Sequence, residues 1–357
     1  MKIKTSIMQN MVSNITKVSL MSRHSAVSNL ISVKAGEEKL ILHTTDIDNH
    51  LYVSSFVKGV EEVDITVNQE IFCKLIQKLD TEDFTIIKDK DAVIITAGKS
   101  TYKLDIPLDE SGNPIELDNL PEPAEWVELD KSIFNKALVN LPACVSTDVT
   151  MPALVNYYFG VDAAIATNQI KMSYIKGNLL GVDYLIPPKL FSLMTLFAER
   201  DVQFAATKDG LFFKGGGTLI IGLPAAEPIT SYPTDAISRL MGTDFTDGTF
   251  KIQKQALLKV LDRLSLFVRE DERMTIQIST NSNELVIASM SKSGVDAIKV
   301  DWVGEPNLNF VASVDISYLS NILSNIVDDN IIISLKDGHS MKIISEGVVN
   351  LLSFVEG

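Results

Sequence analysis

The sequence predicts an α+β fold of three tandem repeats, each with two helices packed on β-sheet. The first observation is a stripe of apolar residues at the i, i+3, i+4, i+7 spacing of a half-buried helix. Such stripes begin at residues 8, 72, 134, 190, 257 and 319. The second is that these starts form two interleaved series of nearly constant spacing. Unrelated amphipathic helices would not be equally spaced, so the pattern indicates an internal repeat.

The first expected domain is residues 1–124. A strand at the N-terminus precedes the helical stripe Met8, Met11, Val12 and Ile15. Alternating β-branched and apolar residues then predict strands in SNLISVKA, EKLILHTT, HLYVSSFV and VDITV. A second helix carries the stripe Phe72, Leu75, Ile76 and Leu79, and further strands follow it. Residues 107–125 are rich in proline and acid and are expected to be an extended connector.

The second expected domain, residues 125–243, repeats this order. Its first stripe is Phe134, Ala137, Leu138 and Leu141, and Pro142 should end or kink that helix. Its second stripe is Leu190, Leu193, Met194 and Phe197. A strand and a Lys208-Asp209-Gly210 turn come next. A second connector that contains prolines covers residues 223–236.

The third expected domain is residues 244–357 and holds the clearest copy of the unit. Its first stripe is Leu257, Val260, Leu261 and Leu264. Its second is Leu319, Ile322, Leu323 and Ile326, between two strands, and Asp315 is placed to cap the N-terminus of that helix. A turn at 336–338 follows the second of these strands.

Composition places the chain among soluble globular proteins, with 46% hydrophobic and 22% charged residues. We expect it to be cytoplasmic, because no apolar run is long enough to span a membrane and the N-terminus lacks the apolar core of a signal peptide. The two cysteines, Cys73 and Cys144, have neither disulfide-framework nor metal-ligand spacing. Neither a membrane partner nor a cofactor is expected.

Charge is distributed unevenly along the chain. The net charge is −14, yet residues 1–36 contain five basic residues and no acid. The helical stretches also carry Lys and Arg opposite their apolar stripes, with few acids. In the helix expected from residue 254, Lys254, Lys259 and Arg263 lie opposite the stripe. A general preference of basic residues for exposed helix faces explains the Lys and Arg, but Glu is an equally good helix former. The scarcity of acids favours a surface that meets a polyanion such as nucleic acid.

Several segments resemble one family, the bacterial sliding clamp, which is the processivity subunit of the replicative DNA polymerase. They are KLILHTTDIDNHL (39–51), LLKVLDRLSLFVREDERMTIQIS (257–279), ISYLSNILSNI (316–326) and Tyr232-Pro233. The resemblance implies three DNA-clamp domains per chain and a homodimeric ring around double-stranded DNA, held without regard to base sequence. It also implies DNA polymerase and a clamp loader as partners, and a non-catalytic role in DNA replication.

The resemblance also implies two sets of site residues. Those expected to contact DNA are Arg23, Lys17, Lys74, Lys78, Lys136, Lys259 and Arg263. A pocket for an apolar partner peptide is expected at Leu154, Thr167, Gln169, Ile170, Lys171, Met172, Pro233, Ile237, Ser238, Leu351, Leu352, Phe354 and Val355. The segments 167–172 and 353–357 depart from the family's pattern. A divergent partner set, such as that of a virus with its own polymerase, is one hypothesis for this departure.

No stretch predicts an active site. Gly98-Lys99-Ser100-Thr101 resembles the end of a phosphate-binding loop, but Val93 replaces its first glycine and no helix follows. Asp46 and Asp48 alone are a weak signal for a metal, and the four histidines have no nucleophile at a suggestive spacing. The alternative to a clamp is a non-catalytic repeat scaffold or accessory protein that binds a partner other than duplex DNA.

Overall fold

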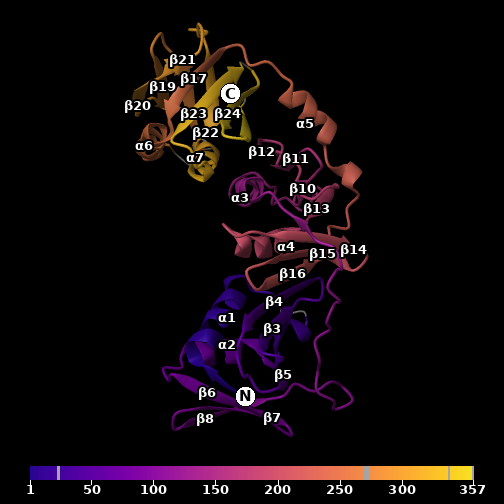
Figure 1. The fold of residues 1–357 in the computed structure, drawn as a ribbon. Helices are drawn as coiled ribbons and strands as arrows, with labels where there is room; N and C mark the ends of the chain where they lie inside the picture. The colour runs from indigo at the N-terminus through magenta and orange to yellow at the C-terminus, as the bar shows by residue number, and fades with distance from the viewer. Residues whose placement is uncertain (22–24, 269–273, 337, 356–357) are drawn as a thin grey trace. The chain divides into compact units, whose positions relative to one another are not determined.

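The computed structural model describes residues 1–21, 25–268, 274–336 and 338–355. The chain divides into two compact units. Unit 1 consists of Met1–Lys131 and Pro188–Pro224, and unit 2 consists of Ser132–Pro187 and Ala225–Gly357. Each unit contains one large antiparallel sheet, one four-stranded sheet and helices packed beside them (Figure 1). The predicted α+β class is therefore confirmed.

Unit 1 contains the first expected domain and the second half of the middle one. Its elements are β1 (Lys2–Lys4), α1 (Thr5–Lys17), η1 (Val27–Asn29), β2 (Leu30–Gly36), β3 (Lys39–Thr45), β4 (Asn49–Phe56), β5 (Val63–Asn68), α2 (Gln69–Gln77), β6 (Asp83–Asp89), β7 (Ala92–Ala97), β8 (Ser100–Asp105), β9 (Val127–Glu128), α4 (Pro188–Met194), η3 (Thr195–Phe197), β14 (Gln203–Thr207), β15 (Gly210–Gly215) and β16 (Thr218–Gly222). Its sheets have the orders β1-β6-β7-β8 and β5-β2-β3-β4-β16-β15-β14-β9.

Unit 2 contains the first half of the middle domain and the last domain. Its elements are α3 (Lys131–Asn140), η2 (Leu141–Ala143), β10 (Tyr157–Phe159), β11 (Ala163–Thr167), β12 (Lys171–Lys176), β13 (Tyr184–Ile186), η4 (Ile229–Ser231), α5 (Thr234–Met241), β17 (Gly248–Gln253), α6 (Lys254–Ser265), β18 (Thr275–Thr280), β19 (Glu284–Ser289), β20 (Val295–Lys299), β21 (Asp301–Trp302), β22 (Val311–Asp315), α7 (Ile316–Asn325), β23 (Asn330–Lys336), β24 (Ser340–Ser345) and β25 (Val348–Ser353). Its sheets have the orders β13-β10-β11-β12-β25-β24-β23-β17-β21 and β20-β19-β18-β22.

All six predicted stripes lie on helices with buried apolar faces, although the last residue of four stripes falls just beyond the α-helix: Leu79, Leu141, Phe197 and Ile326. In unit 1, α1 and α2 lie side by side, and Met8, Ile15 and Phe72 are fully buried beneath them (Figure 1). In unit 2, α6 and α7 are in contact in the same way, and their side chains Leu257 (on α6) and Leu319 (on α7) are buried. Burial of one face stabilises each short helix, because helices of about ten residues are marginal by themselves in water.

The predicted helix boundaries have clear local causes. The Asp315 carboxylate accepts hydrogen bonds from Ser317 N at 2.8 Å and Tyr318 N at 3.0 Å, which confirms the predicted cap of α7. Pro142 ends α3, as predicted, and the chain tightens into η2. One helix was not predicted: α5 lies where the second connector was expected to run into the last domain.

The sheets are continuous across the expected domain boundaries. β4 pairs with β16 in unit 1, and β12 pairs with β25 in unit 2. Each of these four strands is the last of a three-stranded meander. In unit 1 the meanders are β2-β3-β4 and β14-β15-β16, and in unit 2 they are β10-β11-β12 and β23-β24-β25. Strand for strand, the eight-stranded order of unit 1 recurs in unit 2, where β13, β10, β11 and β12 take the places of β5, β2, β3 and β4. The two large sheets therefore share one strand order, as expected for a repeated domain.

Unit 1 also contains a buried pair of histidines. His43 Nε2 and His50 Nδ1 are 3.1 Å apart, and the His43 ring stacks on Tyr52 with centroids 4.0 Å apart. Burial, with smaller contributions from His50 and Lys34, lowers the pKa of His43 to about 3. Burial also lowers the pKa of His50, against the opposing effect of Asp118 and Asp46. Both rings are therefore neutral in the folded chain at neutral pH.

The histidine pair predicts a loss of stability in mild acid. The unfolded chain takes up a proton on His43 below about pH 6.5, whereas in the folded chain this ring stays neutral down to about pH 3. We expect the free energy of unfolding of unit 1 to fall by roughly 2 kcal/mol between about pH 7 and pH 5. Urea unfolding of a Trp302→Phe variant, in which Trp126 fluorescence reports unit 1, measures it.

His43→Phe is the control for this effect, because phenylalanine can stack on Tyr52 but cannot take up a proton. The carboxylates with a lowered pKa, Glu70, Asp109 and Asp148, lose stabilisation only at lower pH. A His43→Phe chain with the same fall in stability would contradict the assignment to the histidines.

Candidate partner-binding groove and basic helix faces

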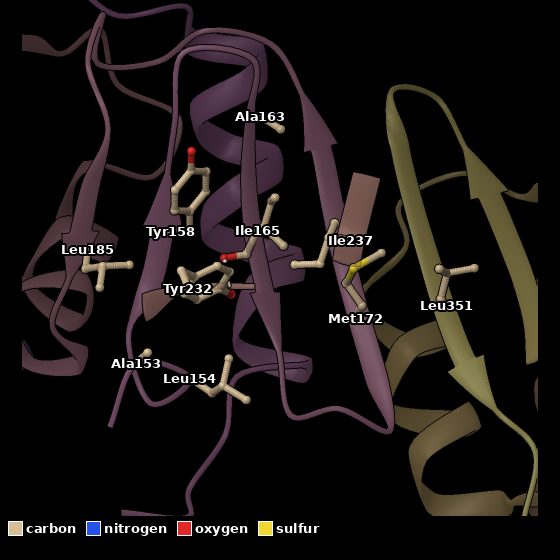
Figure 2. Close-up of a cluster of buried hydrophobic side chains, with 10 residues drawn as sticks. All are labelled: Ala153, Leu154, Tyr158, Ala163, Ile165, Met172, Leu185, Tyr232, Ile237 and Leu351. Atoms are coloured by element: carbon tan, nitrogen blue, oxygen red, sulfur yellow. Dashed lines mark hydrogen bonds between the residues drawn. The ribbon is translucent and has the colours of Figure 1, made fainter. Parts of the chain in front are cut away.

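The candidate groove lies on the nine-stranded sheet of unit 2, over β10, β11, β12 and β25. Side chains from these strands meet residues of the second connector and of α5 in one apolar cluster (Figure 2). Its buried members are Ala153, Leu154, Tyr158, Ala163, Ile165, Met172, Leu185, Tyr232, Ile237 and Leu351. The cluster fixes the connector against the sheet.

Tyr232 is the anchor of the connector. Its ring stacks on Tyr158 with centroids 5.1 Å apart, and its hydroxyl donates to Ile165 O at 3.3 Å. Burial raises the pKa of this hydroxyl, so it stays protonated and remains a donor. Figure 2 shows the ring lying between the strands and the loop that carries Leu154. The aromatic residue of the Tyr232-Pro233 pair thus has a structural role, and Pro233 lies beside an open pocket.

This open pocket, here called the unit 2 pocket, has a volume of about 410 Å³. It is lined by Met151, Pro152, Ala153, Leu154, Gln169, Glu227, Pro228, Ser231 and Pro233. Apolar side chains dominate, and Glu227 is the charged residue of this set. The size and lining suit a few apolar side chains of an extended peptide.

The rim at Gln169 is shaped by the β11–β12 turn. Thr167 Oγ1 accepts from Gln169 N at 3.1 Å and donates to Lys171 O at 2.9 Å. The Asn168 side chain accepts from Lys171 N at 2.9 Å. These bonds hold Gln169 at a φ of 75°, a conformation that is uncommon for a residue with a side chain. The turn therefore fixes Gln169 at the edge of the pocket.

The structure brings seven of the predicted pocket residues to the groove and its base. Leu154, Gln169 and Pro233 line the unit 2 pocket, and Met172, Ile237 and Leu351 belong to the apolar cluster beneath it. Thr167 forms the turn. Ile170 is 44% exposed next to Gln169, and Ser238 is exposed on α5.

Four predicted pocket residues have other contacts. Side chains of neighbouring strand residues point to opposite faces, so Leu352, fully buried, faces away from Leu351. Lys171 Nζ lies 4.5 Å from the Tyr318 ring centre on α7. Phe354 packs edge-on against Phe310 with centroids 5.7 Å apart, and Val355 N donates to Ser313 O. Direct contact of a bound peptide with these four stays a prediction.

Sequence reasoning missed part of the lining. Met151, Pro152, Glu227, Pro228 and Ser231 were not among the expected residues, although all line the pocket. The only local signal was the proline content of residues 223–236. Proline marks a connector but does not show which face of a sheet that connector covers.

Unit 1 presents three of the predicted DNA contacts. Lys17 is the exposed last residue of α1, and Lys78 is the exposed residue that caps α2. Lys74 is exposed but forms an ion pair with Glu70 at 2.5 Å, which lowers the pKa of Glu70. Because α2 starts at Gln69, it also contains Glu70, and this acid offsets part of the positive charge of Lys74 and Lys78. Arg23 lies outside the described residues.

Unit 2 presents the other three. Lys259 is exposed on α6, and Lys136 is half-buried on α3. Arg263 Nε donates to the Asp296 carboxylate at 2.8 Å. Lys254 was expected on the basic face of α6, but it is buried, and its ammonium donates to Ile326 O at the C-terminus of α7. Its charge stabilises the negative end of that helix dipole.

None of the helices in the described part of the chain is both long and apolar enough to cross a membrane.

Comparison with known proteins identifies the fold. No protein-family model matches the chain, and no curated protein sequence matches it. Among solved structures, the DNA polymerase sliding clamp of Bacillus subtilis has a TM-score of 0.86 and 19% identity, covering 100% of this chain and 98% of that one.

Two further structures give the same result. A sliding clamp of Pseudomonas aeruginosa bound to griselimycin has a TM-score of 0.85 and 14% identity, over 100% of this chain and 99% of that chain. The DNA polymerase III beta subunit of Thermotoga maritima has a TM-score of 0.81 and 12% identity, with the same two coverages. The chain has the fold of the bacterial DNA sliding clamps over its whole length.

Proposed function

We propose that this protein is a non-catalytic DNA sliding clamp, which encircles duplex DNA and increases the processivity of a replicative polymerase. The observation that carries the proposal is the match of the whole chain to structures named as DNA polymerase sliding clamps. Function rests on sites rather than folds, so the proposal also needs an oligomer, a DNA-facing surface and a partner site. Its place of action would be the cytoplasm.

The unpaired strand edges support a homodimer. β8 and β20 end their four-stranded sheets, and within the described residues each has one side without a strand partner. If β8 of one chain pairs with β20 of another, the order becomes β22-β18-β19-β20-β8-β7-β6-β1. This order matches β5-β2-β3-β4-β16-β15-β14-β9 of unit 1 position by position. Two such junctions join two chains head to tail and close the assembly into a ring.

Exposed apolar side chains lie near both edges. Leu266 is 82% exposed and Phe267 45% exposed after α6, where the Phe267 ring lies against Gly294 at the start of β20. In unit 1, Tyr102 on β8 and Ile71 on α2 are also exposed. Burial of such residues at two junctions would stabilise the dimer, and an open strand edge without a partner would invite aggregation.

DNA contact would come from Lys17, Lys74, Lys78, Lys136, Lys259 and Arg263, and from Arg23. Lysine and arginine bind phosphates without reading base sequence, which is what a protein that slides requires. The polymerase and the clamp loader would dock short apolar segments in the unit 2 pocket, one per chain.

A topological experiment tests the proposal. Protein loaded by its own loader onto nicked circular DNA should be retained during gel filtration and lost once the circle is cut. Retention is expected because a closed ring can leave only over a free end. If equal amounts stay on linear and circular DNA, the sliding model is wrong and the alternative, a scaffold that binds another partner, is favoured.

Charge reversal tests the basic helix faces. We expect Lys78→Glu with Lys259→Glu to lower the amount of clamp retained on circular DNA at about 100 mM salt by roughly tenfold, because each change converts an attraction for phosphate into a repulsion. Lys39→Glu with Lys58→Glu, which alters exposed lysines outside these helices, should have little effect. Equal losses in both variants would show that net charge alone controls retention.

A further inference from the structure

We propose that unit 1 carries a second docking groove, which binds a short segment of a partner protein with basic side chains next to apolar ones. The groove, here called the unit 1 pocket, has a volume of about 510 Å³. It is lined by Val27, Thr45, Ile47, Asp48, His50, Glu116, Asp118, Leu120, Lys208, Asp209, Ile221 and Leu223. The proposal does not depend on DNA binding or on peptide binding at the unit 2 pocket.

The turn at the rim of this pocket has the same hydrogen bonds as the β11–β12 turn. Thr45 Oγ1 accepts from Ile47 N and donates to Asn49 O, both at 2.9 Å. Asp46 Oδ1 accepts from Asn49 N at 2.8 Å, as Asn168 accepts from Lys171 N. Ile47 has a φ of 86°, as Gln169 has one of 75°. Ile47 in the unit 1 pocket therefore corresponds to Gln169 in the unit 2 pocket.

The strand pair beneath the turn corresponds as well. His50 on β4 lies opposite Ile221 on β16, as Met172 on β12 lies opposite Leu351 on β25. In each unit a connector closes the other side: residues 116–120 in unit 1 and residues 227–233 in unit 2. The two pockets are thus the same structural position in two copies of the repeat.

The lining of the unit 1 pocket combines exposed apolar groups with acids. Ile47 is 64% exposed and Leu223 45% exposed, while Ile221 is buried at the base. Ile47 has a β-branched side chain, a left-handed backbone conformation and an exposed position. This conformation is strained for a β-branched residue, and such strain is found mainly at functional sites.

The charges distinguish this pocket from its counterpart. Asp48, Glu116, Asp118 and Asp209 line it with a single basic residue, Lys208. In the described part of the chain, none of these four carboxylates takes part in a salt bridge. A segment with arginine or lysine would neutralise them and would place its apolar side chains on Ile47, Leu223 and Ile221. The same negative charges repel the phosphates of DNA. A peptide with basic and apolar side chains matches both the charges and the apolar lining of the pocket, so we take a peptide as the occupant.

Fluorescence anisotropy with the full-length protein tests the proposal. The probe is a labelled hexapeptide, Arg-Leu-Arg-Phe-Arg-Leu, at about 150 mM salt. We expect it to bind at least about tenfold more tightly than the acidic hexapeptide Glu-Leu-Glu-Phe-Glu-Leu and than Arg-Ser-Arg-Ser-Arg-Ser, which lacks the apolar groups. Equal binding of the Arg-Ser peptide would mean unspecific attraction to an acidic protein and would overturn the proposal.

Variants locate the site. Asp48→Asn with Asp118→Asn should weaken binding of the basic apolar peptide about tenfold. Asp89→Asn with Glu110→Gln makes the same change in charge at exposed positions outside the pocket and should leave binding unchanged. Equal losses in both variants, or a loss on Glu227→Gln in the unit 2 pocket instead, would also overturn it. Thermal unfolding of each variant confirms that it is folded.

Discussion

Ala297→Pro will convert the proposed dimer into a monomer of 39.3 kDa at micromolar concentration. Ser289 N donates to Gly294 O and Val300 N donates to Asn283 O, so the even-numbered residues of β20 bond to β19. The alternation of an antiparallel ladder then directs the N–H groups of Val295, Ala297 and Lys299 to the open edge. Proline at 297 removes the central N–H, which in the single chain donates to the Asp296 carboxylate at 3.0 Å, and places its ring where the partner strand must approach.

The expected loss is about 2–3 kcal/mol at each junction, so the two junctions together lower dimer affinity by at least about a thousandfold. Sedimentation velocity over a concentration series measures it. Ala297→Ser keeps the N–H and is the matched control, which should stay dimeric. Circular dichroism of the proline variant should be unchanged, since the β19–β20 ladder does not use this N–H. A proline variant that remains a dimer would rule out β20 as the interface strand.

Under the proposed function, Met151→Ala with Leu154→Ala will abolish most of the stimulation of the polymerase by this protein. Both side chains line the unit 2 pocket, and their truncation removes much of the apolar surface that a docked peptide would cover. Deleting two anchor contacts of this kind costs about 2–4 kcal/mol of binding, so half-maximal stimulation should require at least about thirtyfold more clamp. Primer extension on a long single-stranded template measures this.

Val161→Ala is the control for the pocket, because Val161 is an exposed apolar residue of the same unit outside the pocket lining. It should stimulate normally. The double variant should also sediment as a dimer and should be retained on circular DNA. Loss of the dimer in that variant would mean that Met151 and Leu154 act through folding rather than through the partner.

The helices could be predicted from the sequence because their signals are local. Apolar residues at helical spacing, such as Met8 with Ile15, must be buried together, and Pro142 and Asp315 act on their own helix within a turn or two. The structure confirms the buried stripes, the end of α3 before Pro142 and the Asp315 cap of α7. The chain order of the repeats followed from the spacing of these stripes.

The pocket could be predicted only in part because it depends on non-local pairing. Nothing local in the sequence states that β12 pairs with β25, a contact between residues far apart in the chain that places Met172 opposite Leu351. The α5 helix was hidden by the prolines before it, and Lys254 looked like a surface charge because helix periodicity does not reveal a neighbouring helix end. Residue types were visible, but their neighbours were not.

The pairing of β4 with β16 has a practical consequence for anyone who dissects the chain. A fragment cut at residue 124 would expose the edge of β4 and lose β9, β14, β15 and β16 from its sheet. The predicted repeat is therefore not the unit that can be excised. A self-contained piece would join residues 1–131 to 188–224 through an artificial linker. It would omit residues 132–187, so it would contain only the second half of the expected middle domain.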